Sequence, residues 1–295
     1  GGQGCRSGSY NFSCGTTSYD DKQGWVYGHS GATTAGGSKL TCGDNTDGSG
    51  TERQVAASCI CAGKSGGDIH TAGYIEDLTW NGGSKNVGFI VKLNEYGMTM
   101  SWQRFIGTNY TNIGGIDTDS SDNVYVAGQD NDGTGTKAFV AKYNSSGTIQ
   151  WQRRLGDPCD GGTYAIAVDD DGNSYSCGKT QSNQHAWITK LDSSGSTVWC
   201  RTMVNSGTGD ENELQQIRLD SKGNIVIAGH HHDNSASSRL GLLMRLPSDG
   251  AFTGTFGIYT FATASPTNAA ASMTTSSDSH ITPVSYTHLT LPTKA

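Results

Sequence analysis

The stretch that decides the fold is Phe139–Arg153, FVAKYNSSGTIQWQR, in which an apolar run passes through a Gly-containing turn into a second run that ends in Trp-x-Arg. Two further stretches share this pattern: Phe89–Arg104, FIVKLNEYGMTMSWQR, and Trp187–Arg201, WITKLDSSGSTVWCR. Short runs rich in Val, Ile, Tyr and Trp on both sides of a turn are typical of two antiparallel strands. The sequence therefore predicts a hairpin at each of the three places.

A second pattern alternates with the first and always closes on a glycine. IDTDSSDNVYVAG ends at Gly128, AVDDDGNSYSCG at Gly178 and IRLDSKGNIVIAG at Gly229. Each copy contains an Asp-Asn or Gly-Asn pair, at residues 122–123, 172–173 and 223–224, which favours a hairpin with a tight primed turn. The closing glycines recur after 50 and then 51 residues. Two hairpins in each period make four strands.

Four strands in about 40 to 50 residues, repeated, is the spacing of β-propeller blades, and such blades gain stability by stacking on their neighbours. Weaker copies end at Gly28 and Gly73, and another covers Leu242–Phe256, so about five units are visible. We expect an all-β protein, a β-propeller of four-stranded blades with a period of about fifty residues. Five units leave open a ring that is incomplete at the N-terminus.

The units resemble a known family of β-propeller repeats, whose members read like AFVAKYDSSGNLLWSRTFGG followed by IAVDSSGNVYVTG. The closest agreement is in Ala138–Gly156 and Ile166–Gly178, and the resemblance covers roughly Asp68 to Gly257. Such repeats occur in marine bacteriophage and bacterial surface proteins. The last unit, Arg245–Phe261, is similar to the closing unit of the bacteriophage repeats, which implies a virus-encoded protein. The N-terminal units depart from the pattern, because Lys64 falls where later units carry Asp119, Asp169 and Asp220.

The chain divides into four parts on these patterns. Residues 1–58 hold divergent N-terminal blades or a truncated start, 59–258 hold the propeller blades, and 259–283 form a Ser/Thr/Ala-rich tail. The stretch VSYTHLTLPT, at Val284–Thr293, equals one translated frame of a common transposase sequencing adaptor. We therefore expect residues 284–295 to be an adaptor artefact that carries no fold information.

Composition and charge exclude several classes of function. The net charge is −7 and no cluster of Lys and Arg is present, so nucleic acid is disfavoured as a partner. No apolar run approaches the roughly 18 to 20 residues that span a bilayer, so no membrane span is predicted. The localisation is left open, with a virion or the extracellular space favoured over the cytoplasm.

The eight cysteines contain no Cys-x-x-Cys pair, which disfavours zinc. Cys59 and Cys61 lie two apart in an expected strand and should point to the same face. Small buried residues are the favoured interpretation of the cysteines, and disulfides remain the alternative.

Three sets of repeated side chains are candidate sites. Asp119, Asp169 and Asp220 stand in acidic loops, which resemble calcium loops but lack the Glu that such loops need, so turn capping is favoured. Long cations recur at Lys92, Lys142 and Lys190, with Arg245 in the last unit, and we expect their stems to pack between blades and their heads to meet a turn Asp. Trp102, Trp151 and Trp199 are expected to fill the space between sheets.

No catalytic constellation stands out. The segment His230–Asp233 is interpreted as a solvated loop, and no Gly-x-Ser-x-Gly motif links a nucleophile to a base. Quinone-cofactor propellers and sialidase Asp-boxes need an Asp near the turn glycine, where this chain has residues such as Tyr143 and Ser145. We expect no cofactor and no bound metal.

The first functional hypothesis is therefore a non-enzymatic propeller that acts as a structural or adhesive binding module, with a protein or glycan surface as its partner and a phage virion as one setting. The alternative is a secreted bacterial surface protein, or a hydrolase or lyase on a propeller scaffold. The alternative requires acidic or His side chains from several blades to converge in one pocket with perturbed pKa values. The chain trimmed at Pro283 is also expected to be poorly soluble or to self-associate, because an incomplete ring exposes sheet edges and apolar faces.

Overall fold

The computed structural model describes the backbone of residues 3–7, 10–16, 24–30, 34–42, 55–65, 67–77, 85–94, 99–181, 185–205, 211–233, 237–277 and 281–286. Side chains are described for the parts of these ranges that lie within 55–76 and 86–277. All the regular elements in these ranges are β-strands, which confirms the predicted all-β class. Among the described residues, none forms a helix with the length and apolarity that a membrane crossing requires.

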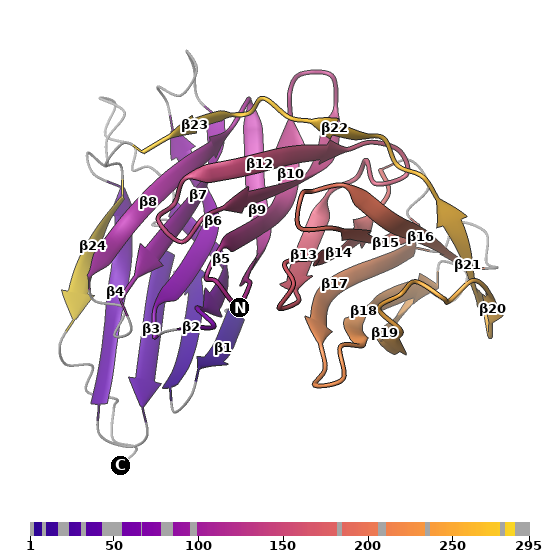
Figure 1. Cartoon of the computed structure of the whole chain (residues 1–295), viewed down its shortest axis with the longest axis horizontal. Helices are drawn as coiled ribbons and strands as arrows, with labels where there is room; N and C mark the ends of the chain where they lie inside the picture. Colours follow the sequence, from indigo (N-terminus) through magenta and orange to yellow (C-terminus); the bar gives the residue numbers. More distant parts are fainter. Residues whose placement is uncertain are drawn as a thin grey trace.

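The strands follow one another in antiparallel meanders that we call units 1 to 5 (Figure 1). Unit 1 comprises β1 (Gln3–Ser7), β2 (Tyr10–Thr16), β3 (Gly24–Ser30) and β4 (Thr34–Cys42). Unit 2 comprises β5 (Val55–Ala62), β6 (Ile69–Asp77), β7 (Lys85–Leu93) and β8 (Met100–Gly107). Unit 3 comprises β9 (Tyr110–Thr118), β10 (Val124–Asn131), β11 (Thr136–Tyr143) and β12 (Ile149–Leu155).

The chain continues with two more units of the same kind. Unit 4 comprises β13 (Thr163–Val168), β14 (Ser174–Lys179), β15 (Ala186–Leu191) and β16 (Thr197–Asn205). Unit 5 comprises β17 (Glu211–Leu219), β18 (Ile225–Asp233) and β19 (Ser238–Leu246). The first strands of successive units lie in contact, β5 with β9, β9 with β13 and β13 with β17. The units therefore fan out in an arc, and none of the described sheets closes into a barrel.

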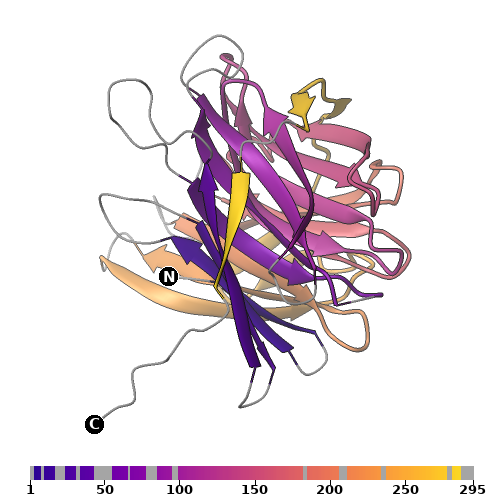
Figure 2. The same cartoon turned by 90° about the vertical axis from the view of Figure 1, so that its left-hand side faces the viewer.

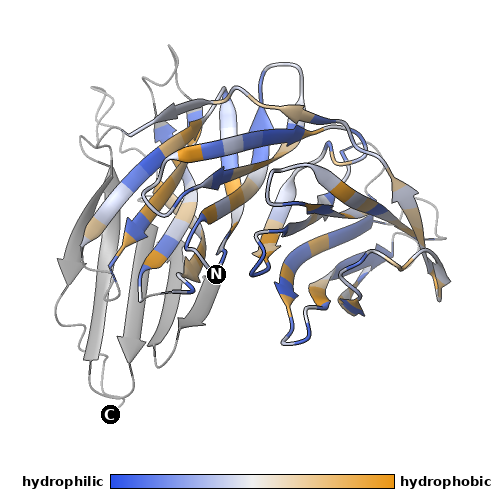
Figure 3. Ribbon diagram, viewed as in Figure 1, coloured by the Kyte–Doolittle hydropathy of each residue, from blue (hydrophilic) through white to orange (hydrophobic). Residues whose placement is uncertain are grey.

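Separate apolar cores lie between neighbouring units. In β11, Phe139 and Ala141 join a core shared with unit 2, whereas Ala138 and Val140 join a core shared with unit 4. Successive side chains of a strand point to opposite faces, so both faces of this sheet are buried. Figure 3 shows hydrophobic bands interspersed with hydrophilic ones along the strands of units 2 to 5.

The closing glycines lie where the first two strands of each unit approach most closely. At Gly128 the pairing of β9 with β10 shifts register, which marks a bulge. A Cβ atom on Gly128 would lie 2.1 Å from the carbonyl oxygen of Asn112. The same atom would lie 2.0 Å from backbone oxygen at Gly178, 2.1 Å at Gly229 and 1.8 Å at Gly73. The recurrence of glycine is therefore a steric requirement of the bulge.

The turns of these hairpins differ from the predicted primed type. The Asp119 carbonyl accepts the N–H of Asp122, and only Asp122 has positive φ, at 54°. Gly172 and Gly223 hold the corresponding positions at φ 79° and 75°. This hydrogen bond and its equivalents at Gly172 and Gly223 centre the turns on residues 120–121, 170–171 and 221–222, none of which has positive φ, so the predicted primed turns on the pairs at 122–123, 172–173 and 223–224 are wrong. The observed loop is longer because the side chain of its first Asp binds the loop's own N–H groups, as described below.

The Ser/Thr/Ala-rich segment forms strands, although the sequence indicates only a tail. β21 (Tyr259–Ala264) pairs with β16, β22 (Asn268–Ala270) with β12, β23 (Thr274–Ser276) with β8, and β24 (Ile281–Tyr286) with β4. Residues 259–277 and 281–286, which we call the strap, thus run back along the outer strands of units 4, 3, 2 and 1 (Figures 1 and 2). β24 crosses the predicted boundary at residue 284. The strap covers edge strands whose N–H and C=O groups would otherwise be unpaired.

Unit 5 lacks its fourth strand. The repeat predicts a hairpin over Leu242–Phe256, but the chain leaves β19 and forms β20 (Gly254–Phe256), which pairs with β21 instead. Phe252 of this segment is buried next to Phe261 of the strap. The predicted hairpin is therefore wrong for this unit.

The outward face of unit 5 is exposed where the other units bury theirs. Leu243 stands directly opposite the residue that precedes the closing glycine, as do Ile90, Val140 and Ile188 in units 2 to 4. Those three side chains are 0% exposed, whereas Leu243 is 77% exposed. Unit 5 therefore ends the stack with an apolar face that has the pattern of an internal one.

Removal of the strap should destabilise the protein. We expect the chain ended at Gly257 to lose at least about 3 kcal/mol of unfolding free energy, the cost of removing one buried aromatic residue, here Phe261. Urea denaturation followed by tryptophan fluorescence measures this difference. The chain ended at Tyr286, which keeps all four strap strands, is the control and should match the full chain. Equal stability of the chain ended at Gly257 would show that the strap contributes nothing.

Self-association should depend on the face that carries Leu243. We expect Leu243→Glu to weaken concentration-dependent association about tenfold, because a charge would have to be buried in the contact. Leu240→Glu is the matched control, since Leu240 is 55% exposed on the same strand but points to the opposite face. Light scattering over a concentration series gives the comparison. A wild-type chain that stays monomeric throughout would contradict the expectation.

Candidate functional site

The three predicted tryptophans join each unit to the next. Each indole N–H donates to a carbonyl in the turn of the following unit, Trp102 to Ser145 at 3.1 Å, Trp151 to Ser193 at 3.0 Å and Trp199 to Ser248 at 3.2 Å. Each tryptophan also lies near an aromatic ring of its own unit; the Tyr125 and Trp151 centroids, for example, are 6.0 Å apart. They therefore lie between sheets, where the sequence places them, and add a hydrogen bond there.

The arginine two residues after each tryptophan completes this contact. Arg104 Nε donates to the Gly147 carbonyl at 2.6 Å, Arg153 to Gly195 at 3.2 Å and Arg201 to Gly250 at 3.1 Å. We call each Trp-x-Arg triplet with the turn it binds a clamp. The arginines are absent from the predicted site, although their recurrence after Trp was visible in the sequence.

The predicted aspartates cap their turns. Each accepts the N–H of the residue four positions later, Asp119 from Asn123 at 3.0 Å, Asp169 from Asn173 at 2.8 Å and Asp220 from Asn224 at 2.9 Å. The bond from Asn224, together with Arg245, holds the pKa of the Asp220 carboxyl well below its usual range. Within the described residues, no three His, Cys, Asp or Glu side chains are grouped so that they could hold a metal ion.

The repeated cations have three kinds of partner. Lys142 lies 3.7 Å from Asp119, and Arg245 lies 2.7 Å from Asp220, as the sequence predicts. Lys92 binds Asp68 at 2.8 Å. Lys190 does not follow the prediction of a turn Asp; its Nζ lies over the ring of Tyr175 at 5.0 Å from the centroid, as Lys142 Nζ lies over Tyr125 at 4.9 Å.

The loop of unit 2 shows that the predicted alignment of Lys64 with Asp119 is wrong by one residue. The Gly63 N–H donates to the Asp68 carbonyl at 2.8 Å, as the Asp119 N–H donates to the Asn123 carbonyl at 3.1 Å. Gly63, not Lys64, therefore holds the position of Asp119, and this loop is one residue longer. The extra residue frees Lys64 to reach the Val168 carbonyl of unit 4 at 2.8 Å.

Units 2, 3 and 4 meet around Asp117, at the ends of β9 and β13. Its Oδ2 accepts the Val168 N–H at 2.8 Å, and its Oδ1 accepts the Thr118 N–H at 2.9 Å. Burial raises the pKa of Asp117, while the bond from Val168 and the charge of Lys64 act in the opposite direction. The enzymatic alternative requires acidic or His side chains of several blades in one pocket, whereas Asp117 is a single carboxyl, and both of its oxygens already accept backbone N–H groups.

The histidine segment is a strand, not the predicted solvated loop. Residues 230–233 belong to β18, and His231 is buried. The His231 Nδ1 lies 3.1 Å from the side-chain oxygen of Asn212. The prediction is wrong because the apolar alternation of β18 continues through His231, whose ring packs edge-on against Tyr259.

The described cysteines, Cys59, Cys61, Cys159, Cys177 and Cys200, are buried. Cys59 and Cys61 belong to one core, on the same face as predicted. The Sγ atoms of Cys159 and Cys200 lie 3.7 Å apart in another. The side chains of Cys5, Cys14 and Cys42 lie outside the described residues.

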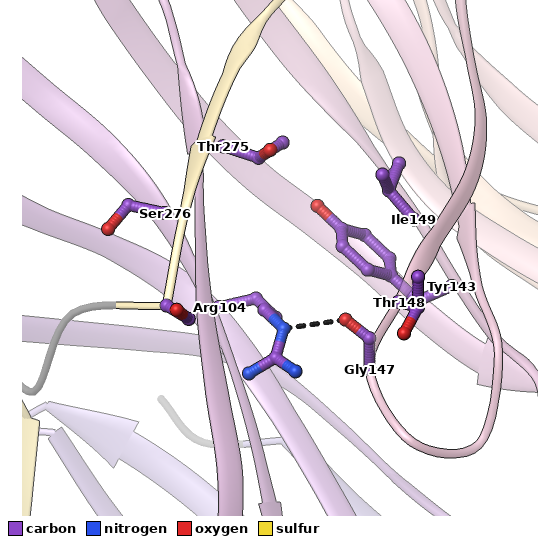
Figure 4. Close-up of a pocket in the computed structure, with 8 residues that line it drawn as sticks. Arg104, Tyr143, Gly147, Thr148, Ile149, Thr275 and Ser276 are labelled. Carbon is purple, nitrogen blue, oxygen red and sulfur yellow. Dashed lines mark hydrogen bonds between the residues drawn. The ribbon is translucent and has the colours of Figure 1, made fainter.

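A cavity of about 300 Å³ lies under the strap at the boundary of units 2 and 3 (Figure 4). It is lined by Arg104, Tyr143, Gly147, Thr148, Ile149, Thr275, Ser276 and Ser277. The Tyr143 side chain is 0% exposed, and its hydroxyl has no hydrogen-bond partner among the described residues. Burial raises the pKa of this hydroxyl well above its usual range, so it is a proton donor at any physiological pH.

A second, more open cavity of about 570 Å³ adjoins the first. The two share Arg104 and Ser277, and Trp102 and Gln103 line the second. Sequence reasoning missed both cavities, because the strap residues that cover them lie more than a hundred residues from the clamp. The one signal was Tyr143, an aromatic residue where neighbouring repeats carry leucine.

No protein-family model matches the sequence, and no curated protein is significantly similar to it.

Acid should destabilise the protein through His70. His70 is 0% exposed, both ring nitrogens lack a hydrogen-bond partner among the described residues, and burial together with Lys92 lowers its pKa to about 4. Between pH 6.5 and 4 the unfolded chain takes up a proton at His70 that the folded chain does not. The unfolding free energy should therefore fall by about 3 kcal/mol across this interval.

The variant His70→Phe should remove this part of the pH dependence. Urea denaturation at pH 7.5 and pH 4.5 gives the two unfolding free energies for each chain. His232→Phe is the control, because His232 is only half-buried on β18. An unchanged slope in His70→Phe would show that other groups cause the loss in acid.

Proposed function

We propose that this chain is a non-enzymatic β-propeller repeat protein that acts as a structural or adhesive binding module. The observation that carries this proposal is the use of the repeated side chains. The tryptophans and arginines bind the next unit, and the aspartates hold their own turns. The side chains that recur from unit to unit thus hold the fold together, as expected of a scaffold that presents surfaces.

The units support the propeller as the finer description of the fold. Units 2 to 4 each hold four antiparallel strands. The first strand of each unit contacts the first strand of the next, and an apolar core fills each boundary between these units. This is how blades pack around a common axis. Unit 5 has three strands and an exposed outward face, so the arc formed by the described units is an open one.

A protein or glycan surface is the proposed partner. The cavities under the strap are lined by hydroxyl and amide groups beside an aromatic ring, a combination suited to polar ligands. The resemblance to bacteriophage repeats supports a virion or extracellular setting. Long-read sequencing across the gene tests that setting, since tail or capsid genes beside it favour a virion and a signal peptide upstream favours a secreted bacterial protein.

The second candidate is a hydrolase or lyase on the same scaffold. Asp117 favours it, because it is a buried carboxyl with a raised pKa where three units meet. A general acid needs such a shift, since its proton must be retained near neutral pH. The bonds from Val168 and Thr118 argue for a structural role instead.

One experiment separates the two candidates. The full chain is incubated on arrays of immobilised glycans and bacterial surface polysaccharides, and both retained protein and released reducing ends are measured. We expect retention without release. Release of reducing ends that is lost in Asp117→Asn but kept in Asp171→Asn, a change at an exposed loop residue, would establish the enzyme instead. Absence of retention on every surface would count against an adhesive role.

A further inference from the structure

The strap crosses three equivalent positions. Thr275 pairs with Ile106, Asn268 with Leu155 and Phe261 with Met203, and each partner lies two residues after a clamp arginine. At each position the strap residue therefore lies over the arginine and the turn of the next unit. We call the space between them a slot, and the repeat allows the three slots to be compared.

Two of the slots are filled by the chain itself. Between units 4 and 5, Phe261 packs edge-on against Phe252 with ring centroids 5.6 Å apart, and both rings are buried. Between units 3 and 4, the Asn268 amide donates to the Gly195 carbonyl at 2.8 Å and to the Thr197 hydroxyl at 2.9 Å. In both cases the strap residue and the residue two positions after the turn glycine close the slot together.

The slot between units 2 and 3 is the cavity of Figure 4. Here Thr275 replaces Asn268 and Ile149 replaces Thr197, so neither member of the closing pair is retained. A third change is Tyr143, which pairs with the first residue of its neighbouring strand as Leu191 does in unit 4. Its hydroxyl is buried at the slot and has no partner among the described residues.

A buried hydroxyl without a partner is unfavourable, and a leucine at this position would avoid it, as in the neighbouring unit. The coincidence of this hydroxyl with the open slot therefore points to a ligand that accepts its proton. The other polar groups at the slot include the hydroxyls of Thr148, Thr275 and Ser277, and Ile149 supplies an apolar wall. No Asp or Glu lines the cavity, and Arg104 is its sole charged lining residue.

We propose that this slot binds one sugar ring of a glycan. The inference rests on the proposed function as a binding module and deepens it. A sugar ring has hydroxyls on its rim, which match the Tyr143, Thr and Ser hydroxyls, and a C–H face, which matches Ile149. A cavity of about 300 Å³ accommodates one ring, and the adjoining cavity beside Trp102 gives a second ring an aromatic surface.

The test uses the full chain and the methyl glycosides of glucose, galactose, mannose and N-acetylglucosamine. Saturation-transfer NMR detects binding, and titration calorimetry gives the dissociation constant of the best glycoside. We expect Tyr143→Phe to weaken binding at least tenfold, because a site built to bond a hydroxyl loses that bond. The double variant Ile149→Phe, Thr275→Phe copies the Phe252–Phe261 pair and should abolish binding.

The matched control is Thr197→Val in the slot that Asn268 fills, which should leave glycoside affinity unchanged. Thermal melting with and without glycoside accompanies each titration. A ligand that stabilises the wild type but not Tyr143→Phe supports the inference. A higher melting temperature of Tyr143→Phe with no glycoside effect on either chain would overturn it, because the hydroxyl would then be a packing defect.

Two outcomes distinguish failure of this inference from failure of the proposed function. Glycoside binding that survives in both Tyr143→Phe and the double variant places the site elsewhere. The proposal of a sugar site in the slot would then be wrong, whereas the proposed function as a binding module would stand. Retention of the full chain on an arrayed surface without any glycoside binding would also refute the sugar site and leave the binding module standing. Loss of both kinds of binding overturns the two together.

Discussion

The contact on which the rest of the structure depends is the clamp of Trp and Arg on the turn of the next unit. A four-stranded sheet with two apolar faces is unstable alone, and stacking needs a fixed distance and angle between sheets. The indole and guanidinium N–H groups set this distance and angle, because they bind backbone carbonyls in a turn of the next unit. That turn is itself held rigid by its own Asn or Asp cap. Each unit thereby positions its neighbour.

The strap depends on the same turns. The Gly195 carbonyl accepts hydrogen bonds both from the clamp residue Arg153 and from Asn268 of the strap, so one carbonyl oxygen joins three segments. The strap also pairs with the outer strands, which would otherwise present unpaired backbone groups to solvent. Its course explains why the slots lie between clamp and strap, and why a change of two side chains opens one of them without disturbing the units on either side.

Much of the local structure could be predicted because it depends on neighbouring residues. The hairpin at Phe139–Arg153 follows from apolar runs on both sides of a turn, and Gly147 takes the positive φ that the turn requires. The turn type at Asp122 could not be predicted from the Asp-Asn pair alone, because the cap from Asp119 selects a longer loop. The strand at His231 could not be predicted because its residues are polar. His231 is buried only because Asn212 bonds its ring and Tyr259 packs against it.

The sequence by itself determined the all-β class, the fifty-residue period and the glycine at each bulge, because strand alternation and steric contact act over a few residues. Only the tertiary structure decided where the strands of the strap lie, since a short Ser- and Thr-rich strand has no partner until the outer strands are in place. The tertiary structure also decided the role of the Tyr143 hydroxyl. In the sequence this residue is one more apolar position, and only the strap, 132 residues later at Thr275, turns its buried hydroxyl into part of a cavity.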